Sequence, residues 1–191
     1  MVSTDDREIA AIATGLGADV PFLRPAHLAA DETPMLDVLA DLVKSLREGH
    51  AYRPDILVLL QPTSPFRRAE HIDGTVDLLR RSGADSVVTI VPVPHQFSPS
   101  SLLQLDGNRL RRWAEGPAPT RRQDKASLFA RNGPAVVAVR TDVVVLQRTL
   151  YGSDMRGLVM SEEDSLDIDT AFDLRVAELL FAGRAGGAAQ A

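Results

Sequence analysis

Apolar runs alternate with amphipathic segments along most of the chain, and this alternation predicts an α/β protein. Residues 56–60 are an unbroken apolar run that stops at a proline-rich loop, as expected of a strand buried on both faces. Apolar residues recur at helical spacing before and after it, within 36–46 and 72–79, and a β-branched run follows at 86–91. This order of elements predicts a mostly parallel, doubly wound sheet covered by helices.

Shorter patterns predict the remaining elements of the core. They are a helix with apolar positions from Ile9 to Leu16 capped by Thr4, Asp5 or Asp6, a strand at 20–23, a cap at Asp31 or Thr33 for the second helix, a strand at 135–139, a helix at 141–149, a strand at 158–160 and a last helix at 170–181. We expect residues 1–182 to form one domain and the Gly/Ala-rich residues 183–191 to form a disordered tail.

The alternation breaks between residues 92 and 132. This segment contains several prolines, many basic residues and a hairpin signal at 106–108, with leucines on both sides of the turn. A connection of this length inside a compact domain is usually functional. We therefore interpret 92–132 as an excursion from the core fold.

Composition excludes several classes of protein. The chain has 191 residues, no cysteine and a net charge of −5, so we expect no disulfide, no thiolate chemistry and no nucleic-acid partner. The sequence contains no apolar run long enough to span a membrane, and we expect a cytoplasmic protein without a membrane partner. The four histidines show no metal-ligand spacing.

Two polar clusters are candidates for chemistry. Gln61 stands in the stiff loop between the apolar run and Pro65, and the carboxyl edge of a parallel sheet is where α/β proteins bind ligands. An ordinary strand-to-helix connection would give the same pattern. Asp167 and Asp169, two residues apart, can turn their carboxylates to one face and share a hard cation. The alternative reading of this Asp-x-Asp is a helix cap in a solvated turn.

The motif Leu-Leu-Gln-Pro-Thr-Ser-Pro-Phe-Arg at 59–67 resembles the central motif of the acylneuraminate cytidylyltransferases, which make CMP-activated sialic acids and related nonulosonic acids. Further blocks follow in the order and approximate spacing of that family, from residue 2 to about residue 180. They are 2–6, 9–10, 17–18, 24–31, 85–88, 122–123, 132–133, 164–169 and 173–174.

This resemblance implies a nucleotidyltransferase that transfers CMP from CTP to a nonulosonic acid with the help of Mg²⁺. By the resemblance, Gln61 and Asp169 are catalytic and Asp167 with Asp169 holds the metal. Arg24 and Asp31 meet the nucleotide, and the sugar acid is bound by Gln61, Arg122, Gln123 and Asn132. The excursion corresponds to an arm that packs against a partner subunit, so the resemblance also implies a homodimer, with Trp113 and Leu102, Leu103 and Leu105 near its interface.

The sequence also departs from the family pattern. Its first residues match the family after the strand and glycine-rich phosphate loop with which such enzymes begin, so we expect weak CTP binding and slow turnover. Pro34 and Met35 stand where small hydroxyl residues are common, and Val136 and Val137 stand where a tyrosine is common near the sugar. Two alternatives therefore stay open: a non-catalytic fragment or paralogue that keeps the sugar-binding and dimer surfaces, and an enzyme for a ketodeoxyoctonate-type acid.

Overall fold

A computed structural model describes the chain apart from residues 115–120, 122–125, 132, 134 and 189–191. The fold divides into two compact units. The first contains residues 1–57 and 139–153, and the second contains residues 58–138 and 154–191.

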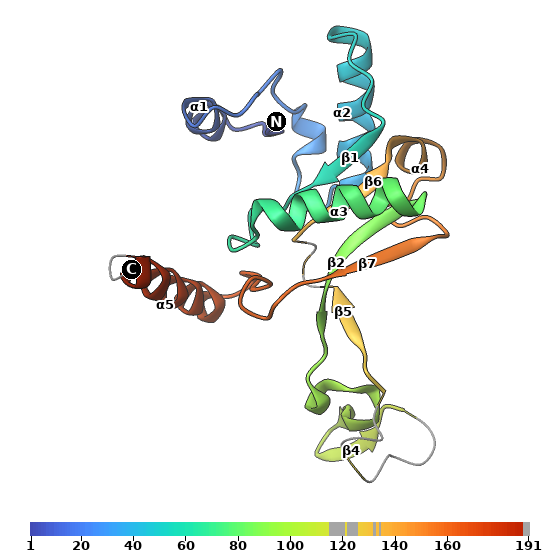
Figure 1. Ribbon diagram of the computed structural model, residues 1–191, viewed down its shortest axis with the longest axis vertical. Coiled ribbons are helices and arrows are strands. Elements are labelled where there is room, and N and C mark those ends of the chain that lie inside the picture. The colour runs from blue at the N-terminus through green and yellow to red at the C-terminus, as the bar shows by residue number, and fades with distance from the viewer. Residues whose placement is uncertain (115–120, 122–125, 132, 134, 189–191) are drawn as a thin grey trace. The chain divides into compact units, whose positions relative to one another are not determined.

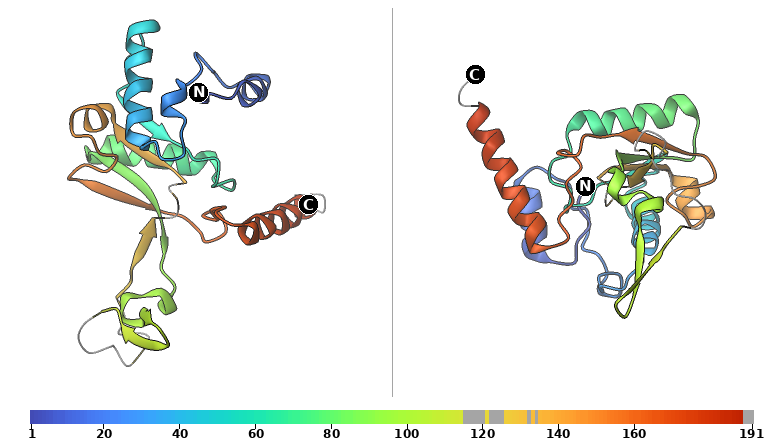
Figure 2. Two further views of the ribbon diagram at one scale, coloured as in Figure 1. Left: turned by 180° about the vertical axis from the view of Figure 1, so that it is seen from behind. Right: turned by 90° about the horizontal axis from the view of Figure 1, so that it is seen from below.

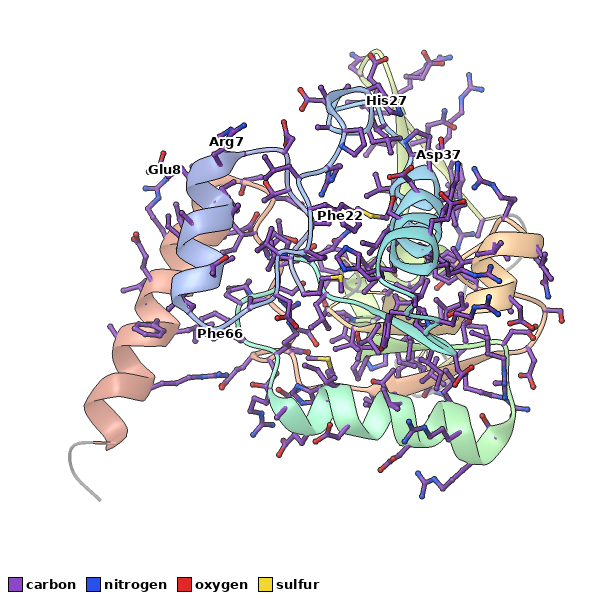
Figure 3. The ribbon with its side chains drawn as sticks, turned by 90° about the horizontal axis from the view of Figure 1, so that it is seen from above. Arg7, Glu8, Phe22, His27, Asp37 and Phe66 are labelled. Atoms are coloured by element: carbon purple, nitrogen blue, oxygen red, sulfur yellow. The ribbon has the colours of Figure 1, made fainter. Side chains whose placement is uncertain are left out.

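The first unit begins with helix α1 (Arg7–Gly15), whose first turn carries Arg7 and Glu8 (Figure 3). Of the three predicted caps, Asp6 is the one in use. Its carboxylate accepts hydrogen bonds from the amides of Glu8 at 2.7 Å and Ile9 at 3.0 Å. The apolar stripe predicted for this helix is exposed within the part of the chain that the structure describes, because α1 has no buried residue there.

The strand predicted at 20–23 does not form. Two backbone hydrogen bonds instead connect residues on either side of this stretch to the first residues of the chain. The Val2 amide donates to the carbonyl of Asp19 and the Arg24 amide donates to the carbonyl of Thr4, each at 2.8 Å. Pro21 interrupts the run and has no N–H to donate, so a regular ladder cannot propagate through it. The short helix η1 (Ala26–Leu28) follows.

Helix α2 (Met35–Gly49) packs against helix α4 (Thr141–Leu146) within the same unit. The inner face of α2 is the predicted apolar stripe, with Val38, Leu39, Val43 and Leu46 buried. Its N-cap position is Pro34, and no side chain caps it, so the caps predicted at Asp31 and Thr33 are not used. Helix α4 ends three residues earlier than predicted, before Arg148 adopts a positive φ.

The sheet has the strand order β1 (Ile56–Leu59), β6 (Val137–Arg140), β2 (Ser86–Pro92), β5 (Phe129–Arg131), and β7 (Met155–Val159) also pairs with β2. Strand β2 runs parallel to β7 from Ser86–Met155 to Ile90–Val159, and antiparallel to β5 from Ile90–Arg131 to Pro92–Phe129. The predicted α/β class is confirmed, and the sheet combines parallel with antiparallel pairs. Figure 1 shows β2 and β7 side by side, and Figure 2 shows the same pairing from behind.

Helix α3 (Ala69–Ser82) covers β2 and β7 in the second unit (Figure 1). Its buried positions are His71, Thr75 and Leu79, whereas the predicted inward residues Ile72 and Val76 are half-buried. A Cβ at Gly74 of the same helix would lie 3.5 Å from the Leu158 side chain, an ordinary packing distance, so this face of α3 lies against β7.

The excursion folds as an arm from the ends of β2 and β5. It contains the short helices η2 (His95–Phe97) and η3 (Pro99–Ser101) and a hairpin of β3 (Leu103–Asp106) and β4 (Arg109–Arg112). The hairpin turns at Gly107, which has a φ of +62°, and Asn108, as the sequence predicts.

The last helix, α5 (Ala171–Ala188), runs past Gly183, where we expected the tail to begin. Among the described residues, no helix combines the length and apolarity needed to cross a membrane.

A buried carboxylate, Asp164, ties α5 to α3 within the second unit. Asp164 is only 5% exposed, and its Oδ2 accepts a hydrogen bond of 2.7 Å from Arg68, just before α3, while its Oδ1 accepts one of 2.9 Å from Arg184 of α5. Arg184 also lies over the ring of Phe66, 4.7 Å from its centre. Burial alone would raise the pKa of Asp164. The hydrogen bonds from Arg184 and Ser161 and the charges of both arginines outweigh burial and hold this pKa below its ordinary value of 3.8.

We expect Asp164→Asn to lower the free energy of unfolding at pH 7 by about 2 kcal/mol, because two guanidinium groups lose their charged acceptor. Since the folded pKa of Asp164 is depressed, its contribution is present above the ordinary value of 3.8 and disappears as the pH falls through the folded pKa. Urea unfolding at pH 7 and in strong acid should therefore show a gap between wild type and variant that closes in acid.

The matched control is Asp154→Asn. Asp154 pairs with Arg156 at the surface, with the Asp154 side chain 46% exposed, so its loss should change stability by no more than about 0.5 kcal/mol. Equal effects of the two substitutions would contradict the role given to Asp164.

Candidate active site

The loop after β1 carries the first group of candidate residues. A backbone hydrogen bond from Ser64 to the carbonyl of Gln61 closes a turn, and the two prolines at 62 and 65 restrict its conformation. Ser64 and Phe66 are buried, and the Gln61 side chain is half-buried (Figure 3 labels Phe66). The loop therefore turns Ser64 and Phe66 inward, while Pro62 and Pro65 face solvent.

The second segment of the site is the one that carries Asp167, and the loop is joined to it by two hydrogen bonds. The Ser64 hydroxyl donates to Oδ1 of Asp167 at 3.1 Å, and the amide of Ile168 donates to the carbonyl of Thr63 at 2.9 Å. These bonds connect positions about a hundred residues apart in the sequence. They place the glutamine-bearing loop beside the predicted metal-binding pair.

Gly133 is the third part of this arrangement. A Cβ at this glycine would lie 1.6 Å from Oδ2 of Asp167 and 2.9 Å from Oδ1, so the carboxylate occupies the space that any other residue would fill. Gly133 also has a φ of +42°, in the left-handed region that favours glycine. The backbone at residue 133 can approach Asp167 only because no side chain stands there.

Arg67 brings a positive charge to the same place. Its Nη1 donates to the carbonyl of Ala135 at 2.9 Å, which fixes the guanidinium against the strand that follows Gly133. Burial lowers the pKa of Arg67, and the negative charge of Asp167 opposes that shift. The positive charge of Arg67 and the negative charge of Asp167 therefore attract each other, although the hydrogen bond of Arg67 goes to the Ala135 carbonyl.

Asp169 was predicted either as a metal ligand or as a helix cap, and the structure assigns the capping to its neighbours. The Asp173 carboxylate accepts hydrogen bonds from the amide and hydroxyl of Thr170, at 2.8 and 2.7 Å, and the Thr170 hydroxyl accepts one from the Asp173 amide at 3.3 Å. Hydrogen bonds from the Thr170 side chain and backbone hold the pKa of Asp173 below its ordinary value. The Asp169 side chain is exposed and makes no hydrogen bond or ion pair with any described residue.

The donor set suits a hard divalent cation that is shared with a substrate. Within the described ranges there is no cluster of three or more His, Cys, Asp or Glu side chains able to cage a metal. A Mg²⁺ ion does not need such a cage, because it is commonly held by one or two carboxylates together with water and substrate phosphates. Asp167 and the uncommitted Asp169 fit that pattern.

Arg24 and Asp31, the predicted nucleotide-binding residues, lie in the first unit. The Arg24 guanidinium donates to the carbonyl and hydroxyl of Ser3, which fixes its side chain against the chain start, and Asp31 is an exposed turn residue. The predicted sugar-binding residues Arg122, Gln123 and Asn132 lie outside the described residues.

Sequence reasoning did not single out Ser64, Arg67 or Gly133 as site residues. Ser64 had a signal, because a hydroxyl residue between two prolines in a predicted ligand loop is fixed in direction. Gly133 had a weaker signal, because it is a glycine shortly before the predicted buried strand at 135–139. Their partner Asp167 is too distant in sequence for any local pattern to reveal the contact.

Comparison with curated proteins finds relatives along almost the whole chain. The CMP-N,N'-diacetyllegionaminic acid synthase of Legionella pneumophila is 29% identical over 94% of this chain and 76% of its own length. The synthase of the same name from Campylobacter jejuni is 27% identical over 94% of this chain and 75% of its own. The N-acylneuraminate cytidylyltransferase A of Danio rerio is 30% identical over 93% of this chain, which corresponds to 39% of the longer fish protein.

No family model matches the chain. Among solved structures, a CMP:2-keto-3-deoxy-manno-octonic acid synthetase complexed with CTP superposes with a TM-score of 0.65 over 96% of this chain and 80% of that one. Its sequence identity is 18%, so this match shows the fold alone. The curated relatives show that the chain is similar, at 27–30% identity, to CMP-N,N'-diacetyllegionaminic acid synthases and to an N-acylneuraminate cytidylyltransferase, and the solved structure adds a shared fold.

Proposed function

We propose that this protein transfers CMP from CTP to a nonulosonic acid and releases pyrophosphate. The observation that carries the proposal is the join between the Gln61 loop and the Asp167 segment beside Gly133, in a chain that aligns over 94% of its length with two CMP-N,N'-diacetyllegionaminic acid synthases. The runner-up acid, of the ketodeoxyoctonate type, is named by a structural neighbour that shares only the fold.

The reaction joins the anomeric hydroxyl oxygen of the acid to the α-phosphorus of CTP. The bond from that phosphorus to the bridging oxygen of the β-phosphate breaks, pyrophosphate leaves, and the hydroxyl proton passes to solvent or to a base. Because such a transfer has little covalent chemistry for the protein to perform, its residues act by positioning and by electrostatics.

Gln61 is suited to orient the acid, since its amide donates and accepts hydrogen bonds and its loop is restrained by prolines. Arg122 would pair with the carboxylate of the acid, with Gln123 and Asn132 beside it, and Arg24 with Asp31 would meet the nucleotide. Cytidylyltransferases that use CTP generally require a divalent metal ion. In our proposal Asp167 and Asp169 hold Mg²⁺, which when bound neutralises phosphate charge.

Turnover can be tested directly on the chain by coupled detection of pyrophosphate, at millimolar CTP and Mg²⁺. The panel should contain N,N'-diacetyllegionaminic acid, N-acetylneuraminic acid and 3-deoxy-manno-octulosonic acid. We expect slow release that depends on both CTP and a nine-carbon acid, and still less with the eight-carbon acid. No acid-dependent release with any of the three would contradict the proposal and favour the non-catalytic alternative.

Asp169→Asn tests the metal assignment. The amide keeps the shape of the side chain but removes a charge that a divalent cation needs, so we expect at least a hundredfold loss of turnover with an unchanged melting temperature. Thr170→Ala is the matched control: it removes the cap of α5 and should cost about 1 kcal/mol of stability while leaving turnover at saturating Mg²⁺ intact. Near-normal turnover of Asp169→Asn would remove Asp169 from the metal site.

We also propose that the protein is a homodimer in the cytoplasm and that the arm forms the subunit interface. On the hairpin, Leu103, Leu105, Leu110 and Trp113 are all exposed, and Phe129 is exposed at the base of the arm. Leu105 and Leu110 are paired across the hairpin, and Leu103 shares their face because it stands two residues from Leu105, so these three leucines form an exposed apolar face of the kind that association surfaces use. A second copy of the chain is the partner that the family resemblance implies.

Analytical ultracentrifugation can test this assembly with two matched substitutions. Leu105, on the arm, is 66% exposed, and Leu146, on α4, is 78% exposed. We expect wild type and Leu146→Glu to sediment as dimers at micromolar concentration and Leu105→Glu to sediment as a folded monomer. A wild-type monomer, or a dimer that tolerates Leu105→Glu, would exclude the arm as the interface.

A further inference from the structure

The two aspartates of the 164–167 segment are held in different ways. Both carboxylate oxygens of Asp164 are occupied by arginines, Oδ2 by Arg68 and Oδ1 by Arg184, and Nε2 of His71 lies 3.8 Å from Oδ2. Among the described residues, Asp167 by contrast accepts one hydrogen bond, from the neutral Ser64 hydroxyl to Oδ1, and the Arg67 guanidinium acts on it through its charge without a hydrogen bond. The carboxylate oxygens of Asp164 are therefore both engaged by arginine side chains, whereas Asp167 can still accept further hydrogen bonds or bind a cation.

A single neutral donor is well suited to orient a carboxylate without neutralising it. The hydroxyl of Ser64 is fully buried, with 0% of the residue exposed, so it cannot turn to water for another acceptor. The backbone bond from Ile168 to Thr63 fixes the distance between the two segments, which leaves the side chains little freedom. The direction of the Asp167 carboxylate thus depends on the Ser64 hydroxyl.

Gly133 limits the carboxylate from the other side. Oδ2 of Asp167 lies 1.6 Å from where a Cβ at residue 133 would stand, so the side chain lies between the serine and the backbone of Gly133. An alanine at this position would have to displace either the carboxylate or the backbone, since contacts below 3.0 Å to real Cβ atoms essentially do not occur. Gly133 therefore leaves room for the Asp167 carboxylate in the orientation that its hydrogen bond with Ser64 favours.

We propose that Ser64 and Gly133 are positioning residues for the cation site: Ser64 orients the Asp167 carboxylate by a hydrogen bond to Oδ1, and Gly133 makes room for it. This inference rests on the proposed function, because it assigns the oriented carboxylate to a divalent cation. Because Ser64 belongs to the loop that carries Gln61, the same contact links the cation site to the residue proposed to orient the sugar acid. Groups that orient a metal ligand typically contribute 10–100-fold to metal affinity or activity.

The experiment measures Mn²⁺ binding directly, by the electron paramagnetic resonance signal of the free ion, on the whole chain without substrates. We expect Ser64→Ala to raise the dissociation constant for Mn²⁺ by about tenfold. Thr75→Val is the control: it removes an equally buried hydroxyl, which donates to the His71 carbonyl within α3, and should leave Mn²⁺ binding unchanged. Circular dichroism and melting temperature record whether each variant is folded.

A double substitution separates positioning from general damage. In an Asp167→Asn background, Ser64→Ala should weaken Mn²⁺ binding no further, because the carboxylate that it orients is already gone. Gly133→Ala should weaken binding at least as much as Ser64→Ala, and the serine variants decide the matter if this one fails to fold.

The outcomes distinguish the inference from the function on which it rests. Wild-type Mn²⁺ binding that Asp167→Asn weakens and Ser64→Ala does not would overturn the positioning role alone. No Mn²⁺ binding by the wild type, together with no pyrophosphate release, would overturn the proposed function and with it this inference. Additive losses in the double variant would also contradict the positioning role.

Discussion

The proposed site depends on one close contact, the Asp167 carboxylate lying in the space of the missing Gly133 side chain. Three segments far apart in the sequence meet there: the loop after β1, the backbone at residue 133 and the stretch before α5. A carboxylate can lie this close to a backbone only where the facing residue is a glycine. A half-buried carboxylate also needs a hydrogen-bond donor in place of the water that it loses. Ser64 supplies the donor, and Arg67 adds a positive charge that is itself held by the Ala135 carbonyl.

Comparison of Asp164 with Asp167 explains how one short acidic segment can serve both stability and chemistry. Asp164 is buried between two arginines and connects α3 to α5, so its charge is compensated within the fold. Asp167 is oriented by a neutral hydroxyl, and the nearby charge of Arg67 acts on it without a hydrogen bond or ion pair between the two described side chains, so its carboxylate oxygens stay able to bind a cation. The environment of each carboxylate, rather than its residue type, separates the two roles.

The sequence was sufficient for features with local causes. The apolar run at 56–60 became β1, the stripe of α2 became its buried face, and Gly107 with Asn108 formed the predicted hairpin turn. It failed where distant parts of the chain decide: α3 buries His71 and Thr75 more completely than Ile72 and Val76, because the packing of the helix against β2 and β7 determines which face is covered. Pro21 prevented a strand for a local reason that the apolar pattern concealed.

The same division applies to the site. Gln61, Asp167 and Asp169 could be named from motifs and their spacing, whereas the roles of Ser64 and Gly133 follow only from contacts across the fold. The most direct measurement is a crystal structure of the protein with Mg²⁺ and CTP. We expect a cation about 2.1 Å from a carboxylate oxygen of Asp167, with the Ser64 hydroxyl still donating to Oδ1. A cation bound elsewhere, or an Asp167 side chain turned away from Ser64, would contradict it.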